Sequence, residues 1–448
     1  MNTADLGLPV DVPSTALFTD QYELTMVRAA LAAGTAGRRS VFEVFTRRLP
    51  NGRRYGVVAG TGRVLDAVEN FRFDTGVIDF LREQGIVDEP TLAWLAEYRF
   101  SGDIWGYPEG EVYFPGSPIM RVEGSFAECV LLETVILSIL NHDSAIAAAA
   151  SRMASAAGDR PLIEMGARRT HELAAVAAAR AAYVGGFTTT SDLAAGFRYG
   201  IPTVGTSAHA FTLLHDNERD AFRAQVDALG PGTTLLVDTY DVEQAVRTAV
   251  EVAGPGLGAV RIDSGDLLLV AHRVRQQLDE LGATGTRIVV TSDLDEYAIA
   301  SLAAAPVDAY GVGTQLVTGS GHPTASMVYK LVARAESDDP RAPLRPVAKK
   351  SSGGKTSMGG RKWAARRLDA EGSAEAEVVG TGPVPAALVD RQLLVELVKG
   401  GEVVAREPLD VARERHATAR ANLPLSATQL SRGEPVLPTE YAHGGSGS

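Results

Sequence analysis

The sequence predicts an α/β fold in which an irregular barrel of seven βα units lies beside an α+β domain built from both ends of the chain. Seven short apolar runs alternate with helical patterns through the middle of the chain, as parallel strands with helical crossovers require. Polar residues and glycines follow almost every run, and the segments on either side lack this alternation. Parallel strands that are buried on both faces have the same continuous apolar character.

The composition is typical of a globular protein with room for two or three domains. The 448 residues are 45 % hydrophobic and 22 % charged, which excludes disorder throughout the chain. The formal net charge of −12 argues against nucleic-acid binding through bulk charge. Cys129 is the only cysteine, so a disulfide within the chain is excluded and a reducing compartment is indicated.

Neither a signal peptide nor a membrane span is expected. The first residues, MNTADLGLPVDVPS, lack the basic and apolar regions of a signal peptide. The most apolar long stretch, Cys129 to Leu140, is interrupted by Glu133 and is too short to cross a bilayer. We therefore expect a cytoplasmic protein with no membrane partner and no nucleic-acid partner.

The two ends of the chain carry short strand-like runs. Residues 1–128 combine such runs with one helical stretch, TDQYELTMVRAALAAG. Residues 341–448 contain further runs, such as RQLLVELVKGGEVV, after a basic and glycine-rich stretch. We expect residues 1–128 to form an N-terminal α+β domain that residues 341–448 complete, with the barrel at residues 129–340.

The barrel region begins with residues 129–157, whose alanine and leucine content predicts one long helix or two abutting helices. Helical patterns separate the strand candidates, which lie at residues 162–167, 183–190, 203–208, 233–240, 258–265, 287–293 and 309–314. Seven units leave the barrel irregular or incomplete. An open doubly wound sheet would also explain the alternation, but polar residues placed so regularly after the strands favour the barrel.

The polar residues that follow the strands mark the expected site, because βα barrels build their sites from these loops. Arginines, acids, hydroxyls and glycines surround one histidine, and the set is Arg168, Arg169, Ser191, Asp192, Thr206, His209, Asp238, Asp241, Arg261, Asp263, Ser264, Asp266, Ser292, Asp293, Asp295, Gly311, Gly313 and Thr314. A purely structural barrel needs fewer charges at one end. Asp241, Asp266 and Asp295 also fit helix N-caps.

A basic loop at residues 349–362, KKSSGGKTSMGGRK, stands out in an acidic chain. Its charges predict either an anion-binding loop or a solvated linker. The loop contains GGKT but is no P-loop, because that pattern needs glycine at the position of Lys349.

Six segments together carry a family resemblance. They are TDQYELTM (19–26), FEVFTRRLP (42–50), EMGARR (164–169), GTSAHAF (205–211), RIDSGDL (261–267) and YGVGT (310–314). In this order and spacing the chain resembles the nicotinate phosphoribosyltransferases from about residue 17 to about residue 365. The resemblance implies a type II phosphoribosyltransferase barrel and a homodimer with active sites at the subunit interface.

The resemblance also implies a reaction. Nicotinate and 5-phosphoribosyl 1-diphosphate give nicotinate mononucleotide and diphosphate in NAD salvage, with ATP hydrolysis coupled to the step and Mg²⁺ required. His209 matches the family's phosphorylated histidine, and an imidazole nitrogen is nucleophilic near neutral pH. Asp238 is a candidate to orient His209 or to hold Mg²⁺. Asp263 matches the position where the family holds the ribose.

The other matched residues concern the two substrates. Arg261 and Thr206 match family contacts to nicotinate, and Arg168 offers a second guanidinium for a carboxylate or phosphate. Tyr22 matches the aromatic side chain that stacks on the pyridine ring from the neighbouring subunit. The residues expected to bind phosphoribosyl diphosphate, or to stabilise the leaving diphosphate with Mg²⁺, are Arg47, Ser264, Gly311, Gly313, Thr314, Lys350 and Lys355.

Two residues depart from the family pattern. Met165 stands where many relatives place an aromatic residue. Asp192 stands where nicotinate-specific relatives often have asparagine and where the nicotinamide-using sister family has aspartate. Asp192 therefore either faces the pyridine substituent, which favours a nicotinamide phosphoribosyltransferase, or caps the helix that follows it. A more distant alternative is a quinolinate phosphoribosyltransferase, which does not use the GTSAH histidine. A non-catalytic phosphate-binding homologue is another, and the intact His209, Asp263 and glycine loop argue against it.

Overall fold

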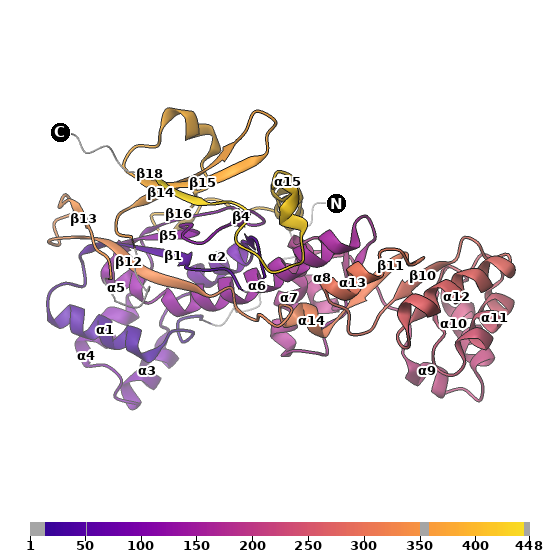
Figure 1. Ribbon diagram of the computed structural model, residues 1–448. Helices are drawn as coiled ribbons and strands as arrows, with labels where there is room; N and C mark the ends of the chain where they lie inside the picture. The colour runs from indigo at the N-terminus through magenta and orange to yellow at the C-terminus, as the bar shows by residue number, and fades with distance from the viewer. Residues whose placement is uncertain (1–13, 51, 350–357, 443–448) are drawn as a thin grey trace.

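Two β-sheets of different kinds lie at opposite ends of an elongated molecule (Figure 1). The computed structural model describes residues 14–50, 52–349 and 358–442. One sheet is antiparallel and takes strands from both ends of the chain, as the sequence predicts for the α+β part. The other sheet is parallel and takes its strands from the middle of the chain.

The antiparallel sheet has seven strands in the order β13-β12-β1-β5-β3-β16-β17. They are β1 (Arg39–Thr46), β3 (Asp103–Gly106), β5 (Met120–Ser125), β12 (Met327–Ala335), β13 (Leu344–Pro346), β16 (Val395–Lys399) and β17 (Glu402–Val403). β1 lies between β5 and β12 and is buried from Ser40 to Thr46. A central strand that is covered on both faces has this burial pattern.

A third sheet, made of three C-terminal strands, packs on the antiparallel sheet. It contains β14 (Lys362–Leu368), β15 (Ala374–Thr381) and β18 (Thr439–Ala442). Ala364 and Val379 of this sheet share one apolar core with Phe42 and Val122 of the seven-stranded sheet. The other elements here are α1 (Gln21–Ala32), β2 (Gly56–Val57), α2 (Thr61–Glu69), α3 (Thr75–Glu83), α4 (Glu89–Ala96), β4 (Val112–Tyr113), η2 (Ala386–Arg391), α15 (Leu409–Ala421) and η3 (Leu425–Thr428).

The parallel sheet curls into a partial barrel of six strands in the order β7-β6-β11-β10-β9-β8. These are β6 (Leu162–Glu164), β7 (Thr189–Thr190), β8 (Thr234–Leu236), β9 (Ala259–Ile262), β10 (Arg287–Val290) and β11 (Ala309–Val312). The intervening helices are α7 (Glu172–Val184), α8 (Leu193–Tyr199), α9 (His209–Leu213), α10 (Glu218–Leu229), α11 (Val242–Ala253), α12 (Leu267–Glu280), α13 (Glu296–Ser301) and α14 (Thr314–Val317). The predicted βα architecture is confirmed.

The barrel has one strand fewer than predicted. Residues 203–208 form no strand, and only an isolated parallel bridge joins Thr190 to Thr203. Pro202 has no N–H to donate, and Thr203 and Gly205 are exposed rather than buried. The sheet is therefore open between β7 and β8, and residues 203–208 form a loop that leads into α9 instead.

Two abutting helices, α5 (Phe126–Val130) and α6 (Glu133–Ala157), replace one continuous helix, and the sequence predicted either arrangement. The first half of α6 packs in the core of the antiparallel part, and its second half packs in the core of the barrel. Residues 126–157 are long and apolar enough to cross a membrane by length and composition alone, but 67 % of the most apolar window is buried within the protein. In this structure the segment forms two helices that pack in the protein core.

The chain leaves the barrel earlier than the predicted boundary at residue 340. β12 begins at Met327 and pairs with β1 from Ser40 to Thr46. The strand therefore belongs to the antiparallel sheet, although the sequence placed it at the end of the barrel region. Pairing partners almost 290 residues apart give no local signal that would mark this change.

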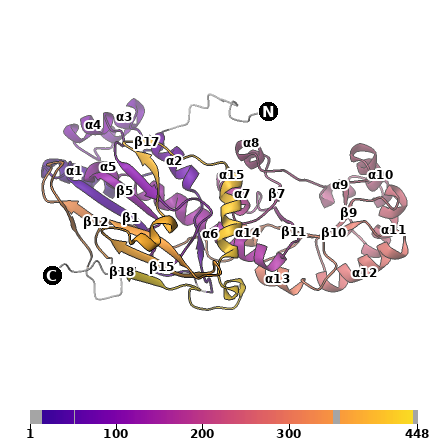
Figure 2. The same ribbon diagram turned by 90° about the horizontal axis from the view of Figure 1, so that it is seen from above.

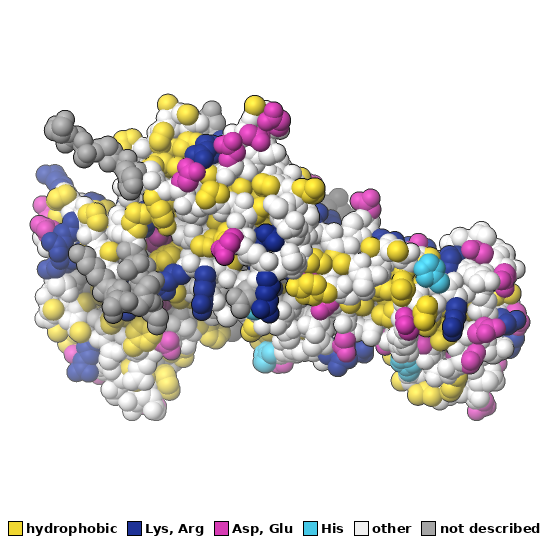
Figure 3. All heavy atoms as spheres, viewed as in Figure 1, with side chains coloured by type: hydrophobic (Ala, Val, Ile, Leu, Met, Phe, Trp, Pro, Cys, Tyr) yellow, Lys and Arg dark blue, Asp and Glu magenta, His cyan; other side chains and the backbone are white. Residues whose placement is uncertain are grey.

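Charged side chains of both signs are scattered among apolar ones on the face seen in Figure 3. Figure 2 shows from above that α1, α3 and α4 lie at one end of the molecule and α10, α11 and α12 at the other. The net charge of −12 is thus not gathered into one acidic patch on the visible face.

A buried histidine ties the C-terminal helix to α6. His416 on α15 lies with Nδ1 3.0 Å from the carbonyl oxygen of Gly110 and Nε2 2.8 Å from Oγ of Ser151. A carbonyl oxygen only accepts, so Nδ1 carries the proton and Nε2 accepts from Ser151, which in turn accepts from the Tyr55 hydroxyl at 2.7 Å. Burial lowers the pKa of His416 from 6.5 to about 4.

We expect this histidine to make the fold sensitive to mild acid. The unfolded chain protonates His416 at a higher pH than the folded chain, so its contribution is complete above pH 6.5 and is lost as the pH falls toward 4. This linkage removes roughly 2 kcal/mol of unfolding free energy between pH 7.5 and pH 5. The measurement is urea unfolding of the wild type and His416→Gln at both pH values. The variant should be less stable at pH 7.5 but should lose less stability on acidification, and an equal loss in both proteins would contradict the assignment.

Candidate functional site

A cavity of about 250 Å³ opens at the carboxyl ends of the barrel strands. It is lined by residues that follow β6, β9, β10 and β11, namely Met165, Arg168, Arg169, Arg261, Asp263, Thr291, Ser292, Asp293, Gly311, Gly313 and Thr314. Most of these residues belong to the polar set that the sequence predicts. The carboxyl ends of parallel strands meet at one end of a barrel, which explains how loops so far apart in sequence converge.

His209 and Asp238 form one hydrogen-bonded pair beside this cavity. His209 begins α9, and its Nε2 lies 3.1 Å from Oδ1 of Asp238. Oδ2 of Asp238 accepts the N–H of Asp263 at 3.0 Å and the hydroxyl of Ser264 at 2.6 Å. Asp238 is 1 % exposed and His209 is 42 % exposed, so a buried carboxylate holds an accessible imidazole. Because a carboxylate accepts, Nε2 of a neutral imidazole carries the proton and Nδ1 carries the lone pair.

Arg261 presents a guanidinium that is only partly satisfied. Its Nη1 donates to Oγ1 of Thr206 at 2.7 Å. Among the described residues, its Nε is buried without a hydrogen-bond partner. Burial lowers the pKa of Arg261, and the nearby carboxylates of Asp263 and Asp238 oppose this effect. A desolvated cation with a free donor is suited to bind an anionic group.

The loop after β10 contributes Thr291, Ser292 and Asp293 to the cavity lining. Thr291 donates its hydroxyl to Oδ1 of Asp263 and so fixes that carboxylate. Ser292 has φ 137°, which is rare for a residue other than glycine and costs backbone strain. Asp293 follows and also lines the cavity. The strained backbone at Ser292, together with the hydrogen bond that fixes Asp263 on the loop after β9, makes these two loops candidate binding elements.

Position 311 requires glycine because other residues approach its backbone closely. A Cβ at this position would lie 2.6 Å from Cγ2 of Thr291 and 2.7 Å from Sδ of Met165. Met165 also donates its N–H to the carbonyl oxygen of Val312 at 2.8 Å. The glycine therefore lets the loops after β6, β10 and β11 approach one another, and Gly313 continues this loop to the start of α14.

Asp192 caps α8. Its Oδ1 accepts the N–H groups of Ala194 at 2.8 Å and Ala195 at 3.1 Å, and the residue is buried. The helix-cap interpretation is thereby confirmed, and the expected contact of Asp192 with the pyridine substrate stays a prediction. Asp241, Asp266 and Asp295 cap their helices in the same way, as the sequence predicted.

Sequence reasoning missed Glu164 at the end of β6. This buried side chain accepts the hydroxyl of Thr190 and the N–H of Gly166, and burial raises its pKa. It fixes the start of the loop that carries Met165 and Arg168. The signal for it in the sequence is an acid placed directly after an apolar strand.

Tyr22 and Arg47 do not line the barrel cavity. Tyr22 is on α1, at the opposite end of the molecule from α9 (Figures 1 and 2). It is 46 % exposed, and burial of the rest of the ring together with Glu133 raises its pKa to about 12. Arg47 lines another cavity, of about 860 Å³, beside Glu43 and Lys362. One chain therefore does not bring these residues to His209.

A buried glutamate that the sequence analysis did not single out holds the helix of Tyr22. Glu23 accepts the N–H of Thr134 at 3.1 Å and also the hydroxyls of Thr134 and Thr19. Burial raises its pKa to about 7, although these hydrogen bonds oppose the shift. Thr134 lies in the first turn of α6, so Glu23 caps that helix from α1. Lys350 and Lys355, also predicted site residues, lie outside the described residues.

Comparison with known proteins gives consistent results. A family model described as the nicotinate phosphoribosyltransferase (NAPRTase) N-terminal domain matches residues 17–141. The nicotinate phosphoribosyltransferase pncB1 of Mycobacterium tuberculosis is 58 % identical over 443 residues, which cover 97 % of this chain and 96 % of the relative. A nicotinate phosphoribosyltransferase of Bacillus subtilis is 38 % identical over 332 residues, covering 72 % and 68 %.

Two solved structures have the same fold. Human nicotinic acid phosphoribosyltransferase matches with a TM-score of 0.80 and 25 % identity, over 95 % of this chain and 97 % of that one. Nicotinate-nucleotide pyrophosphorylase from Pyrococcus furiosus matches with a TM-score of 0.74 and 24 % identity, over 94 % and 99 %. The partial barrel and its antiparallel partner are thus a type II phosphoribosyltransferase fold. With 58 % identity to a relative along nearly all of both sequences, the chain belongs to the nicotinate phosphoribosyltransferase family.

Proposed function

We propose that this protein transfers the phosphoribosyl group of 5-phosphoribosyl 1-diphosphate to nicotinate, forming nicotinate mononucleotide and diphosphate in cytoplasmic NAD salvage. The observation that carries the proposal is the half-satisfied guanidinium of Arg261, which lies beside Asp263 and the glycine loop in one cavity. This cavity combines a cation for a carboxylate, an acid for hydroxyl groups and a backbone loop for a phosphate. The family membership gives the same reaction class.

Nicotinate is the pyridine substrate that this cavity favours. Its carboxylate can accept from the guanidinium of Arg261, which lines the cavity, and Arg168 adds a second positive charge there. Thr206 holds the guanidinium in place through Nη1. Oδ1 of Asp192 is already bound to two backbone amides of α8, so nothing in this arrangement favours nicotinamide.

The phosphoribosyl group has its own part of the cavity. We assign the ribose hydroxyls to Asp263, whose carboxylate Thr291 already orients. We assign the 5′-phosphate to the loop from Gly311 to Thr314, where backbone N–H groups can approach an anion. Ser264 is held by Asp238 and lies next to Asp263 on the same loop.

The chemistry is a displacement at the ribose carbon with an oxocarbenium-like transition state. The pyridine nitrogen forms a bond to that carbon as the bond to diphosphate breaks, so negative charge grows on the leaving group. Catalysis then depends on positioning the reactants and on cations near the diphosphate. We therefore name no nucleophile of the protein for this step.

Magnesium fits this site as an ion shared with the substrate. In the described part of the chain, no group of three or more His, Cys, Asp or Glu side chains could hold a metal ion. Asp263 and Asp293 both line the cavity, and Mg²⁺ commonly uses one or two carboxylates with phosphate oxygens and waters. When bound, the ion would neutralise charge on the diphosphate.

ATP coupling is assigned to His209. Its Nδ1 is the free nucleophilic nitrogen because Asp238 holds Nε2, and the side chain is accessible. Nδ1 would take the γ-phosphoryl group as ADP leaves, and water would later release the phosphate. The new negative charge beside Asp238 and Asp263 would reorganise the cavity between turnovers.

We further propose a homodimer whose sites combine two chains. Tyr22 lies on α1, which is remote from the barrel of its own chain (Figure 1), and Arg47 lines a different cavity. A second copy in a two-fold arrangement can bring them to the open cavity. Large apolar side chains near His209, such as Leu213 and Leu214, are exposed in the single chain and suit a contact surface.

Replacing Arg261 should affect nicotinate more than phosphoribosyl diphosphate. Arg261→Ala removes a charge-assisted contact, which we expect to raise the KM for nicotinate about 10- to 100-fold. Steady-state kinetics with each substrate varied gives both constants, and nicotinamide is tested in parallel. Arg287→Ala, at the exposed amino end of β10, is the matched control and should behave as wild type. Equal losses for both substrates would place the pyridine elsewhere.

The tautomer of His209 gives a second prediction. Asp238→Asn can still accept from Asp263 and Ser264, but its amide donates to Nε2 and moves the imidazole proton to Nδ1. We expect phosphoenzyme formation from γ-labelled ATP to fall roughly 100-fold, with ATP-independent nucleotide synthesis retained. His209→Ala should abolish labelling altogether. ATP stimulation that survives in His209→Ala would contradict the assignment.

Mixed dimers test the shared site. Tyr22→Ala and Arg261→Ala dimers should each be poorly active, because every site contains one altered residue. Random exchange between equal amounts makes half of the dimers mixed, and each mixed dimer has one intact site, so about a quarter of wild-type activity should return. The control mixes Arg261→Ala with Thr206→Ala, which both lie on the barrel side and should give no recovery. A mixture of Tyr22→Ala and Arg261→Ala without recovery would place both residues in one chain's site.

A further inference from the structure

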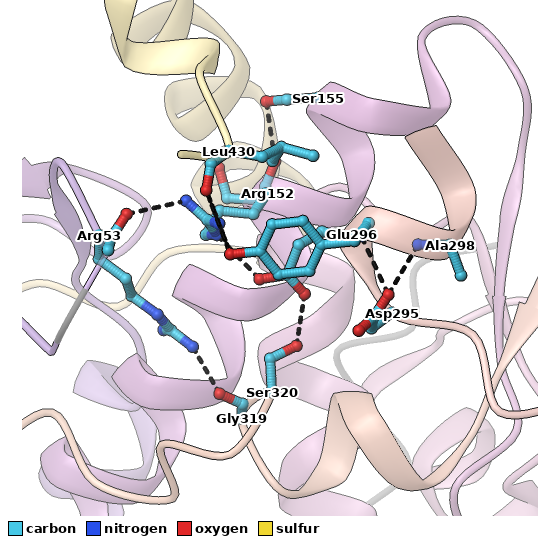
Figure 4. A network of polar contacts seen from close by, with 12 residues as sticks. Arg53, Arg152, Ser155, Asp295, Glu296, Ala298, Gly319, Ser320 and Leu430 are labelled. Carbon is cyan, nitrogen blue, oxygen red and sulfur yellow. Dashed lines mark hydrogen bonds and ion pairs between the residues drawn. The ribbon is translucent and has the colours of Figure 1, made fainter. Parts of the chain in front are cut away.

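A buried carboxylate outside the cavity connects two of the loops that line it. Glu296 is the first residue of α13. Its Oε1 accepts Nε of Arg152 on α6 at 2.9 Å, and its Oε2 accepts the hydroxyl of Ser320 at 2.6 Å (Figure 4). Both charged side chains are almost fully buried. Burial alone would raise the pKa of Glu296, but hydrogen bonds from Ser320, its own backbone amide and Arg152 lower it.

The two partners of Glu296 fix different parts of the barrel. Residues 291–293 line the cavity and lead directly through Asp295 into Glu296. The loop from Gly311 to Thr314 leads through α14 into a turn that contains Ser320. The carboxylate of Glu296 therefore links the far ends of both loops and anchors them to α6 through Arg152.

The turn that Ser320 occupies is held in a strained conformation. Gly319, Ser320 and Gly321 have φ values of 63°, 51° and 79°. The left-handed region is unfavourable for serine, so surrounding contacts must hold it there. Ser320 donates its N–H to the carbonyl oxygen of Gln315 at 2.6 Å. Nη2 of Arg53 donates to the carbonyl oxygen of Gly319 at 2.5 Å.

Arg152 extends the same network to segments near both ends of the chain. Its Nη1 donates to the carbonyl oxygen of Gly52 at 3.2 Å, and its Nη2 donates to that of Leu430 at 3.1 Å. Nη2 also lies 3.3 Å from the hydroxyl of Tyr297, the residue after Glu296. Figure 4 shows Arg152 and Arg53 converging on this region from separate segments. The link between the loops is thus rigidly supported.

We propose that Glu296 is a positioning residue that, with Arg152 and Ser320, sets the spacing between the loop after β10 and the phosphate loop after β11. This inference rests on the proposed function, in which these loops bind phosphoribosyl diphosphate. The nicotinate contacts depend on Arg261 and Thr206, which no contact of Glu296 involves. The network therefore governs affinity for the phosphoribosyl substrate and not for the pyridine.

Two variants remove the link in different ways. Ser320→Ala breaks the bond to the turn and keeps the buried ion pair of Glu296 with Arg152. Glu296→Gln keeps the shape but leaves only one oxygen to accept from two donors. We expect each to raise the KM for phosphoribosyl diphosphate about 5- to 10-fold, with the KM for nicotinate within about twofold of wild type.

Arg160→Met is the matched control. Arg160 donates to the carbonyl oxygens of Leu302 and Ala305 after α13 and to the hydroxyl of Tyr310 on β11, at the amino-end face of the same strands. This variant weakens the same helix and strand away from the cavity. We expect it to lower Tm with both KM values unchanged.

Calorimetric titration with phosphoribosyl diphosphate supplies a readout that needs no turnover. Ser320→Ala and Glu296→Gln should raise the Kd by the same factor as the KM. If the wild type binds this substrate and both variants bind it equally well, the positioning role is wrong. If the variants change only Tm, as Arg160→Met does, their role is structural and the inference is also wrong. If the wild type neither binds nor consumes phosphoribosyl diphosphate, the proposed function itself fails.

Discussion

The long helix α6 is the constraint on which both ends of the molecule depend, because its two halves are buried in two different cores. Its 25 residues span about 37 Å at 1.5 Å per residue. Glu23 caps its first turn and so fixes α1, which carries Tyr22. Near its other end, Arg152 holds Glu296 and the loops of the barrel cavity. The helix thus keeps α1 and the barrel cavity at a fixed, large separation within one chain.

The acids around the cavity and Arg261 differ in how completely their polar atoms are hydrogen-bonded. The buried acids Glu164, Asp238 and Glu296 each accept at least two hydrogen bonds. Arg261 is the opposite case, since its Nε is buried and, among the described residues, unpaired. Acids that are satisfied before substrate arrives act as fixed scaffolding, and they cost no reorganisation during the reaction. In the proposed function the guanidinium of Arg261 is the group that binds the incoming carboxylate.

The parts of the fold that could be predicted from sequence have local signals. Apolar runs followed by polar residues predicted the barrel strands, and Asp241, Asp266 and Asp295 were predicted as caps because a cap acts within three residues. The predicted strand at 203–208 was wrong because Pro202 and exposed polar residues outweigh a short apolar pattern.

The parts that could not be predicted depend on distant partners. Glu23 and Glu296 resemble surface glutamates in helical patterns, yet their partners lie 111 and 144 residues away in the chain. The position of β12 depends in the same way on pairing with β1. The separation of Tyr22 and Arg47 from His209 follows from the packing of whole domains, which no motif encodes.

Whether the cavity prefers an acid or an amide substrate depends on which of its polar groups lack a hydrogen-bond partner within the protein. Asp192 accepts two amides at the start of α8 through Oδ1 and does not line the barrel cavity. Arg261 is desolvated, and a carboxylate ligand would compensate for that loss of solvation better than a neutral amide. A site that binds a group through a buried cation discriminates strongly against an analogue that lacks the charge. In the proposed function the discrimination in favour of nicotinate resides in Arg261, and Asp192 caps α8.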